Sequence, residues 1–125
     1  MKTFYISTPI TGDAKKNIEA AKRACNWFRL SAISLSPVLT FDYLDQGDWL
    51  FQSNAMDLMT LCDEVYVFGF DITEGMKFEL DHARKKKKSV RLYDDSFNAV
   101  NVRTLPIDER AAQEYRMAVQ GLRLE

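Results

Sequence analysis

Hydrophobic residues along this chain follow two different spacings. Short apolar runs at 2–7, 32–36, 64–68 and 90–93 are typical of buried strands, and the run at 64–68 is the most apolar. Between and after these runs, apolar residues recur every three or four positions, which predicts amphipathic helices. The expected helices cover 14–30, 48–61, a segment that ends at about residue 86, and 108–122.

The alternation of strands and helices predicts one α/β domain over residues 1–125. Pro37 ends the second strand, and residues 38–45 are expected to form a loop. Strand–helix–strand units of this kind give parallel strands with helices on both faces. We therefore expect a Rossmann-like or flavodoxin-like three-layer sandwich with a four- or five-stranded parallel sheet. Residues 94–105 show no clear pattern.

Composition and charge narrow the functional classes. The formal net charge of −1 gives no reason to expect a nucleic-acid partner. No apolar stretch reaches the ~18–20 residues of a membrane span, and the N-terminus has no signal-peptide pattern. Cys25 and Cys62 form no CxxC pair, so reduced thiols and a cytoplasmic location are expected. Because His82 is the single histidine, a zinc site is not expected.

Polar residues follow each predicted strand. The loops after the four strands are 8–12, 37–45, 70–75 and 94–96. In a parallel sheet the carboxyl ends of all strands lie along one edge, where open α/β folds bind ligands. The sequence therefore predicts a ligand crevice formed by these loops.

Glu79 is the strongest candidate for chemistry in this crevice. It is expected in the first turn of a helix that follows a buried strand and a tight turn with Gly75, and this glycine lets the backbone approach a ligand closely. Thr73 or Glu74 is expected to cap the helix, and Met76 to pack it on the sheet. A carboxylate held there can act as a nucleophile or a base, whereas the alternative is a solvated helix residue.

The first loop, Thr8-Pro9-Ile10-Thr11-Gly12, combines hydroxyls, a glycine and the start of a helix. Backbone N–H groups at such a turn suit a phosphate or a sugar hydroxyl, although an ordinary turn has the same composition. The loop matches neither GxGxxG nor GxxxxGK, so dinucleotide and P-loop chemistry are not indicated.

Tyr5 lies on the first predicted strand, beside the third strand in the commonest arrangement. Its hydroxyl is either in reach of a carboxylate at the sheet edge or simply the rim of a core aromatic. Asp57, Asp63 and Asp71 are further carboxylates near this edge or on the second long helix. Asp63 is expected to terminate that helix, and Asp57 to face either the crevice or solvent.

These motifs together resemble the nucleoside 2-deoxyribosyltransferase superfamily, which includes the 2′-deoxynucleoside 5′-phosphate N-hydrolases. The resemblance is closest to its short, mostly uncharacterised bacterial and phage branch. The matching motifs are Thr3-Phe4-Tyr5-Ile6-Ser7 with the first loop, Asn17, Ser36-Pro37, Cys62 to Val67, and Thr73 to Leu80 with Ala83.

The resemblance implies that the Glu79 carboxylate attacks the anomeric carbon of a 2′-deoxynucleoside and expels the base. Another base or water then resolves the deoxyribosyl-enzyme. Tyr5 would position the carboxylate, and Ser7 to Gly12 with Thr73 to Met76 would contact the sugar or a 5′-phosphate. No metal or organic cofactor is needed. The resemblance also implies a homo-oligomer, a dimer or larger, with shared sites.

The general acid departs from the family pattern. The helix aspartate of the family falls at Ala55, and Asp57 lies two residues away, ~200° around a helix. A local shift would bring Asp57 or Asn54 into place, or Asp42 or Asp71 would substitute. The alternative is a non-catalytic nucleotide-binding module that senses or sequesters its ligand. The missing acid favours that module, whereas Tyr5 together with Glu79 favours an enzyme.

The predicted site comprises two sets of residues. The catalytic candidates are Glu79, Tyr5, Asp57 and Asp71. The substrate-binding candidates are Ser7, Thr8, Pro9, Ile10, Thr11, Gly12, Asp42, Thr73, Glu74, Gly75 and Met76.

Overall fold

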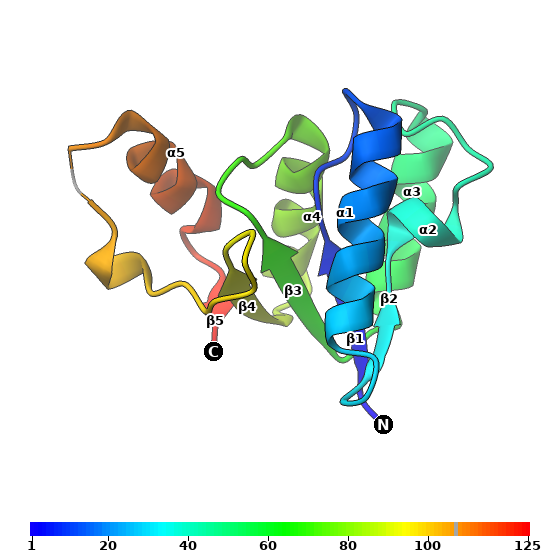
Figure 1. Cartoon of the computed structure of the whole chain (residues 1–125), viewed down its shortest axis with the longest axis horizontal. Coiled ribbons are helices and arrows are strands. Elements are labelled where there is room, and N and C mark those ends of the chain that lie inside the picture. Colours follow the sequence, from blue (N-terminus) through cyan, green and yellow to red (C-terminus); the bar gives the residue numbers. More distant parts are fainter. Residues whose placement is uncertain (107) are drawn as a thin grey trace.

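A single parallel sheet forms the centre of the protein. The computed structural model describes residues 1–106 and 108–125. Its strands lie in the order β2-β1-β3-β4-β5, and all four pairings are parallel (Figure 1). The strands are β1 (Thr3–Ser7), β2 (Ile33–Leu35), β3 (Glu64–Phe68), β4 (Ser89–Tyr93) and β5 (Arg123–Leu124). The expected single α/β domain with a parallel sheet is confirmed, with five strands.

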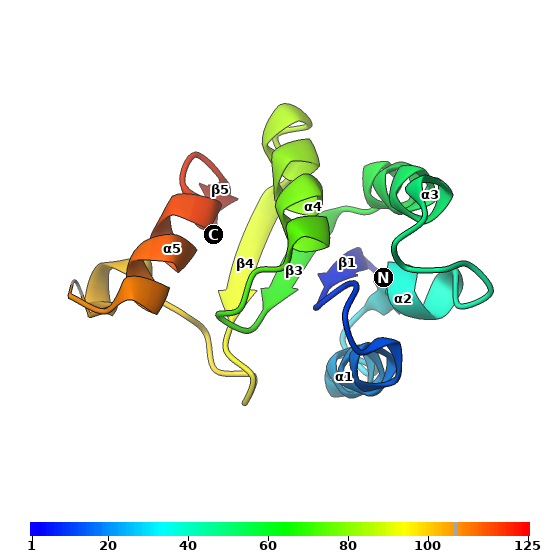
Figure 2. The ribbon, with the colours of Figure 1, turned by 90° about the horizontal axis from the view of Figure 1, so that it is seen from above.

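Helices cover both faces of the sheet (Figures 1 and 2). They are α1 (Ala14–Trp27), α2 (Pro37–Thr40), α3 (Trp49–Thr60), α4 (Glu74–Lys85) and α5 (Arg110–Val119), with a 3₁₀ turn at Val102–Thr104. Side chains of α3, α4 and α5 share one core with Tyr5, Val65 and Val67. Those of α1 share another with Phe4, Ile6 and Phe68. Adjacent strand residues thus enter opposite layers, as the period of two requires.

Two features in the first half of the chain differ from the predicted ones. The first helix ends at Trp27 instead of residue 30, because Phe28 caps it and its carbonyl accepts from the N–H of Ala32. Pro37 begins the short helix α2 where a loop was expected. The Ser36 side chain caps this helix, and proline suits the first helical turn because its missing N–H is not needed there.

The C-terminal region differs as well. The last helix covers Arg110–Val119 instead of 108–122, and the chain then turns through Gly121, whose φ is +80°. This left-handed backbone is easy for glycine and lets the chain return to the sheet as β5. None of the helices in the described part of the chain is long and apolar enough to cross a membrane.

Candidate active site

Two residues of β1 face α4 at the carboxyl edge of the sheet. Tyr5 and Ser7 are two positions apart on the strand, so their side chains share one face. Both are fully buried. Because β1 lies between β2 and β3, this face is in the interior of the sheet and not at its margin.

The first loop packs directly against the N-terminus of α4. Thr73 caps the helix by accepting from the N–H of Met76, and its hydroxyl also accepts from the N–H of Ile10 at 3.4 Å. A Cβ on Gly75 would lie 2.9 Å from the Ile10 Cβ, so only glycine permits this approach. Thr73 therefore caps α4, as expected, and the contact fixes the helix against the strand.

Glu79 is in the second turn of α4 and not in the first, because the helix begins at Glu74 and includes Gly75, which was predicted to lie in the turn before it. Its side chain is 1% exposed. The Tyr5 hydroxyl donates to Glu79 Oε2, and the Ser7 hydroxyl donates to Oε1 at 2.9 Å. Met76 and Leu80 are fully buried on the same helix and hold it on the sheet. The structure thus brings Tyr5, Ser7 and Glu79 together in one buried cluster.

The protonation state of Glu79 follows from this burial. Burial raises the pKa of the carboxyl to about 8, and the hydrogen bonds from Tyr5 and Ser7 oppose this increase only partly. Burial and the adjacent Glu79 also raise the pKa of Tyr5 well above its usual value. Glu79 is therefore mostly a neutral acid at pH 7, and it becomes a carboxylate above pH 8.

A cavity of about 20 Å³ adjoins Glu79. This is room for one water molecule, not for a nucleoside. The lining residues come from the first loop, the segment between α2 and α3, helix α3 and helix α4: Ile10, Gln46, Phe51, Gln52, Ala55, Met56, Gly75 and Glu79. The carboxyl is thus enclosed in this conformation, and a larger ligand needs the surrounding loops to move.

The position expected for a general acid faces this cavity but holds no acid. Ala55 is 1% exposed and lines the cavity beside Glu79. Asp57 is exposed, two residues further along α3, close enough to His82 to affect the pKa of its ring. His82 is half-buried and pairs with Thr60 through Nε2 at 2.9 Å. The structure does not bring Asp57 to Glu79.

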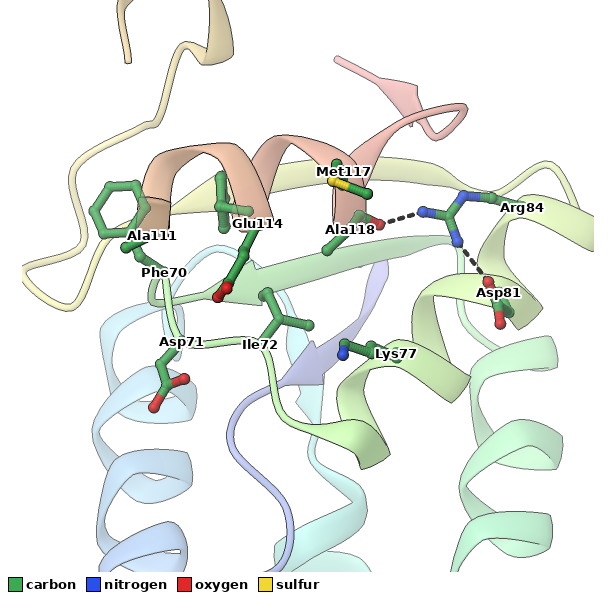
Figure 3. A pocket seen from close by; sticks show the side chains of 11 residues that line it. Phe70, Asp71, Ile72, Lys77, Asp81, Arg84, Ala111, Glu114, Met117 and Ala118 are labelled. Atoms are coloured by element: carbon green, nitrogen blue, oxygen red, sulfur yellow. Dashed lines mark hydrogen bonds and ion pairs between the residues drawn. The ribbon is translucent and has the colours of Figure 1, made fainter. Parts of the chain in front are cut away.

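Asp71 lies on the other side of α4. It lines a cavity of about 590 Å³ between the β3–α4 loop, α4 and α5 (Figure 3). In this cavity, Arg84 bonds to Asp81 and to the carbonyl of Ala118 (Figure 3). Glu79 does not line this larger cavity. Its size alone therefore does not make it the site of the predicted chemistry, and Asp71 is separated from the Tyr5–Glu79 pair.

Five of the remaining predicted binding residues line one of two cavities. Ile10 and Gly75 line the small Glu79 cavity, whereas Thr11, Gly12 and Asp42 line a cleft of about 480 Å³ between α1 and residues 42–47. Four others line neither cavity. Thr8 is buried, and its hydroxyl has no partner among the described residues, whereas Met76 is in the core. Pro9 is half-buried, and Glu74 is exposed and paired with Lys77.

Gln46 and Gln52 line the Glu79 cavity and were not predicted from the sequence. Gln46 lies in an irregular segment whose path no periodicity reveals. Gln52 is on α3, where Phe51, Ala55 and Met59 form a buried stripe at four-residue spacing. That stripe marks the inner face of α3 and is the signal that places the adjacent Gln52 near the cavity.

Residues 2–93 match the family described as "Domain of unknown function (DUF7768)", and the chain belongs to that family. No curated protein matches the sequence. Among solved structures, the chain is similar to a 2-deoxyribosyltransferase from the psychrotolerant bacterium Bacillus psychrosaccharolyticus, with 16% sequence identity and a TM-score of 0.58. The similarity covers 81% of this chain and 78% of the transferase chain. At this identity it establishes a shared fold.

Proposed function

We propose that this protein cleaves or exchanges the N-glycosidic bond of 2′-deoxynucleosides or their 5′-monophosphates, with residues 1–125 as a nucleoside 2-deoxyribosyltransferase-like domain. The observation that carries the proposal is the buried cluster in which Tyr5 and Ser7 both donate to Glu79. Hydroxyl donors on both oxygens fix the orientation of the carboxyl group, as a nucleophile requires. The shared fold with a 2-deoxyribosyltransferase agrees with this chemistry.

In the proposed first step, a Glu79 carboxylate oxygen forms a bond to the anomeric carbon of the deoxyribose. The C–N bond breaks, and its electron pair leaves with the base, which takes up a proton from water. In the second step, the nitrogen of another base or a water molecule attacks the same carbon and loses its proton to solvent. The bond to Glu79 breaks, and its electron pair stays on the carboxylate. This is the double displacement of retaining glycosidases applied to an N-glycosidic bond.

Tyr5 and Ser7 have a positioning role in this proposal, and their hydroxyls also stabilise the charged form of Glu79. The sugar or phosphate contacts would come from Ser7 to Gly12, Thr73 to Met76 and Asp42. Opening of the small cavity hydrates Glu79 and lowers its pKa, which supplies the ionised nucleophile when substrate enters. We further propose that the protein acts as a homo-oligomer and that its substrate is a small nucleoside or nucleotide.

The test is chromatography of the protein incubated with the four 2′-deoxynucleosides and their 5′-monophosphates, with and without a second free base. The Glu79→Gln variant is the control, because it keeps the shape of the side chain without the nucleophilic carboxylate. Base release or exchange that this variant lacks supports the proposal. Equal turnover by the variant, or none by the wild-type protein, rejects it.

A second candidate function is a nucleotide-binding module without turnover. The observation that favours it is Ala55, which lines the Glu79 cavity where the proposed enzyme would need a proton donor for the leaving base. Its signature is a nucleoside-dependent increase in melting temperature in the absence of base release. Ligand at ~100 times Kd would add about 2.7 kcal/mol to the free energy of unfolding.

A further inference from the structure

Gln46 separates two hollows of the molecule. It is the one residue that lines both the small cavity at Glu79 and the cleft of about 480 Å³ beside α1, among the residues that the structure describes. Gln46 lies in the segment between α2 and α3, at the right of Figure 1. Because both linings share Gln46, movement of this side chain together with its loop would connect the cleft to Glu79. The combined space lies within the 300–1,000 Å³ range of small-molecule sites.

Two hydrogen bonds hold Gln46 in this position. The backbone N–H of Thr11 donates to its Oε1 at 3.1 Å, and the Asn17 side-chain amide donates to the same oxygen at 2.9 Å. Asn17 is itself anchored, since it also donates to the Thr11 carbonyl. Two donors thus converge on one acceptor oxygen of a residue that lines the cleft. A ligand oxygen that replaces Gln46 Oε1 would inherit both donors.

The charges of the cleft select against an anionic ligand. Its lining includes Asp42 and Asp45, both exposed, and neither hollow is lined by a lysine, arginine or histidine within residues 1–106 and 108–125. Lys15 and Lys16 follow on α1 but are not among the lining residues. A phosphate dianion entering here meets two like charges and no counter-charge.

The helix N-termini around the site do not compensate for these charges. Asp13 caps α1 and accepts from the N–H of Lys16 at 3.1 Å, and Asp48 caps α3 and accepts from the N–H of Leu50 at 3.0 Å. At α4, Glu74 is in the first turn, where it also pairs with Lys77 at 2.8 Å. Carboxylates already complement the positive end of each helix dipole, where a phosphate would otherwise bind.

We propose that the cleft beside Gln46 is the entrance to Glu79 and admits uncharged, hydroxyl-bearing ligands while it excludes phosphate monoesters, with Gln46 as the residue that closes the path. Asp42 and Asp45 accept hydrogen bonds from sugar hydroxyls, and the Thr11 and Asn17 donors take a hydroxyl oxygen in place of Gln46. The substrate class is then the free nucleoside. This inference rests on the proposed function in taking Glu79 as the destination of the ligand.

Calorimetric titration of the Glu79→Gln variant with each 2′-deoxynucleoside and its 5′-monophosphate tests the inference without turnover. We expect each nucleoside to bind about tenfold more tightly than its monophosphate at low ionic strength, with a smaller ratio in high salt. Adding Asp42→Asn and Asp45→Asn reduces the ratio by strengthening monophosphate binding. Adding Asp108→Asn and Glu109→Gln instead removes the same charge beside α5, on the far side of the sheet (Figure 2), and leaves the ratio unchanged.

The rate of nucleoside association, measured by stopped flow, tests whether Gln46 closes the path to Glu79. Gln46→Ala joins the two hollows permanently, so nucleoside association becomes severalfold faster, whereas Gln120→Ala after α5 has no effect. Monophosphates that bind as tightly as nucleosides, or no binding of either class, overturn the proposal. Nucleoside binding without base release by the wild-type protein supports this entrance while it rejects the proposed glycosyl chemistry.

Discussion

The Tyr5 hydroxyl donates a hydrogen bond to Glu79 Oε2 although 74 residues separate the two in sequence. The contact exists because β1 is an interior strand and α4 packs over it. Both side chains are almost completely buried, so neither exchanges this bond for one with bulk water. Glu79 and Tyr5 therefore titrate as a coupled pair, and a change in one alters the other.

The Tyr5→Phe substitution is expected to lower the free energy of unfolding by about 1–3 kcal/mol, because it leaves Glu79 Oε2 buried without this donor. The lost hydrogen bond also stabilised the charged carboxylate, so the pKa of Glu79 rises further. Urea denaturation measures the first effect. The pH at which base release reaches half its maximum, which moves upward, measures the second.

Tyr115→Phe is the matched control for this substitution. Tyr115 is 1% exposed and belongs to the same core cluster as Tyr5, but its hydroxyl has no hydrogen-bond partner within the described part of the chain. Its removal is expected to be neutral or stabilising. Equal losses of stability in the two variants would show that the Tyr5–Glu79 hydrogen bond has no special energetic weight.

Sequence patterns predicted the parts of the site that regular structure positions. The strand β3 begins at Glu64 and ends at Phe68, as its apolar run indicated, and the Thr73 cap follows from local chemistry. Side chains alternate between the two faces of a strand, and β1 lies next to β3 in the parallel sheet. Tyr5 therefore faces α4, the helix that follows β3. Glu79 lies in the second turn and not the first, yet the helix still directs it to this face.

The rest of the site depends on irregular segments, where no period applies. Gln46 reaches the Glu79 cavity because Asp45 accepts from the N–H of Gly47 and Asp48 caps α3, so the chain turns at this point. Helix α2 overlaps the segment that was predicted to be a loop. Pro37 was expected to end regular structure, but it begins this helix. The enclosure of Glu79 is a tertiary property that single-sequence patterns do not contain.

Glu79→Gln is expected to remove a pH dependence of stability. The folded-state pKa of about 8 exceeds the usual 4.5, so the folded protein binds more protons than the unfolded chain between these values. The contribution of Glu79 to stability is thus complete below pH 4.5 and is lost as the pH rises through about 8. At pH 9 the variant should be more stable than the wild type by on the order of a few kcal/mol, measured by urea denaturation.

The control for this pH dependence is Glu19→Gln, which changes an exposed glutamate on α1. It should keep the wild-type decline in stability between pH 5 and pH 9, since it leaves Glu79 in place. A wild-type protein whose stability does not fall over this range would contradict the elevated pKa of Glu79. In turnover experiments, kcat/KM should reach half its maximum near pH 8 and level off above that pH, because the free enzyme needs ionised Glu79.

Gly75→Ala tests the contact between the first loop and α4. The added Cβ would lie 2.9 Å from Ile10 Cβ and 3.1 Å from its Cγ2, so α4 or the loop must move. We expect a loss of about 1–3 kcal/mol in the free energy of unfolding and a larger proportional loss of activity, because Glu79 moves with α4. Gly47→Ala, whose Cβ would meet Asp45 Oδ1 at 3.5 Å, should change stability by less than about 0.5 kcal/mol. Equal effects of the two substitutions would contradict the role of the Ile10 contact.

Ala55→Asp separates the enzyme from the binding module. Ala55 lines the Glu79 cavity, so an aspartate there places a carboxylic acid beside the departing base. General acid catalysis at this position is expected to accelerate base release by about 10²-fold.

Ala55→Asn is the matched control, since asparagine has a similar size and no acidic proton. Burial of either new group is expected to lower the free energy of unfolding by about 1–3 kcal/mol. Chromatography of released base compares the two variants at pH values on either side of 8. Faster base release by Ala55→Asp alone supports glycosyl chemistry that is limited by the supply of a proton. Equal rates for both variants would show that the side chain at position 55 takes no part in the reaction.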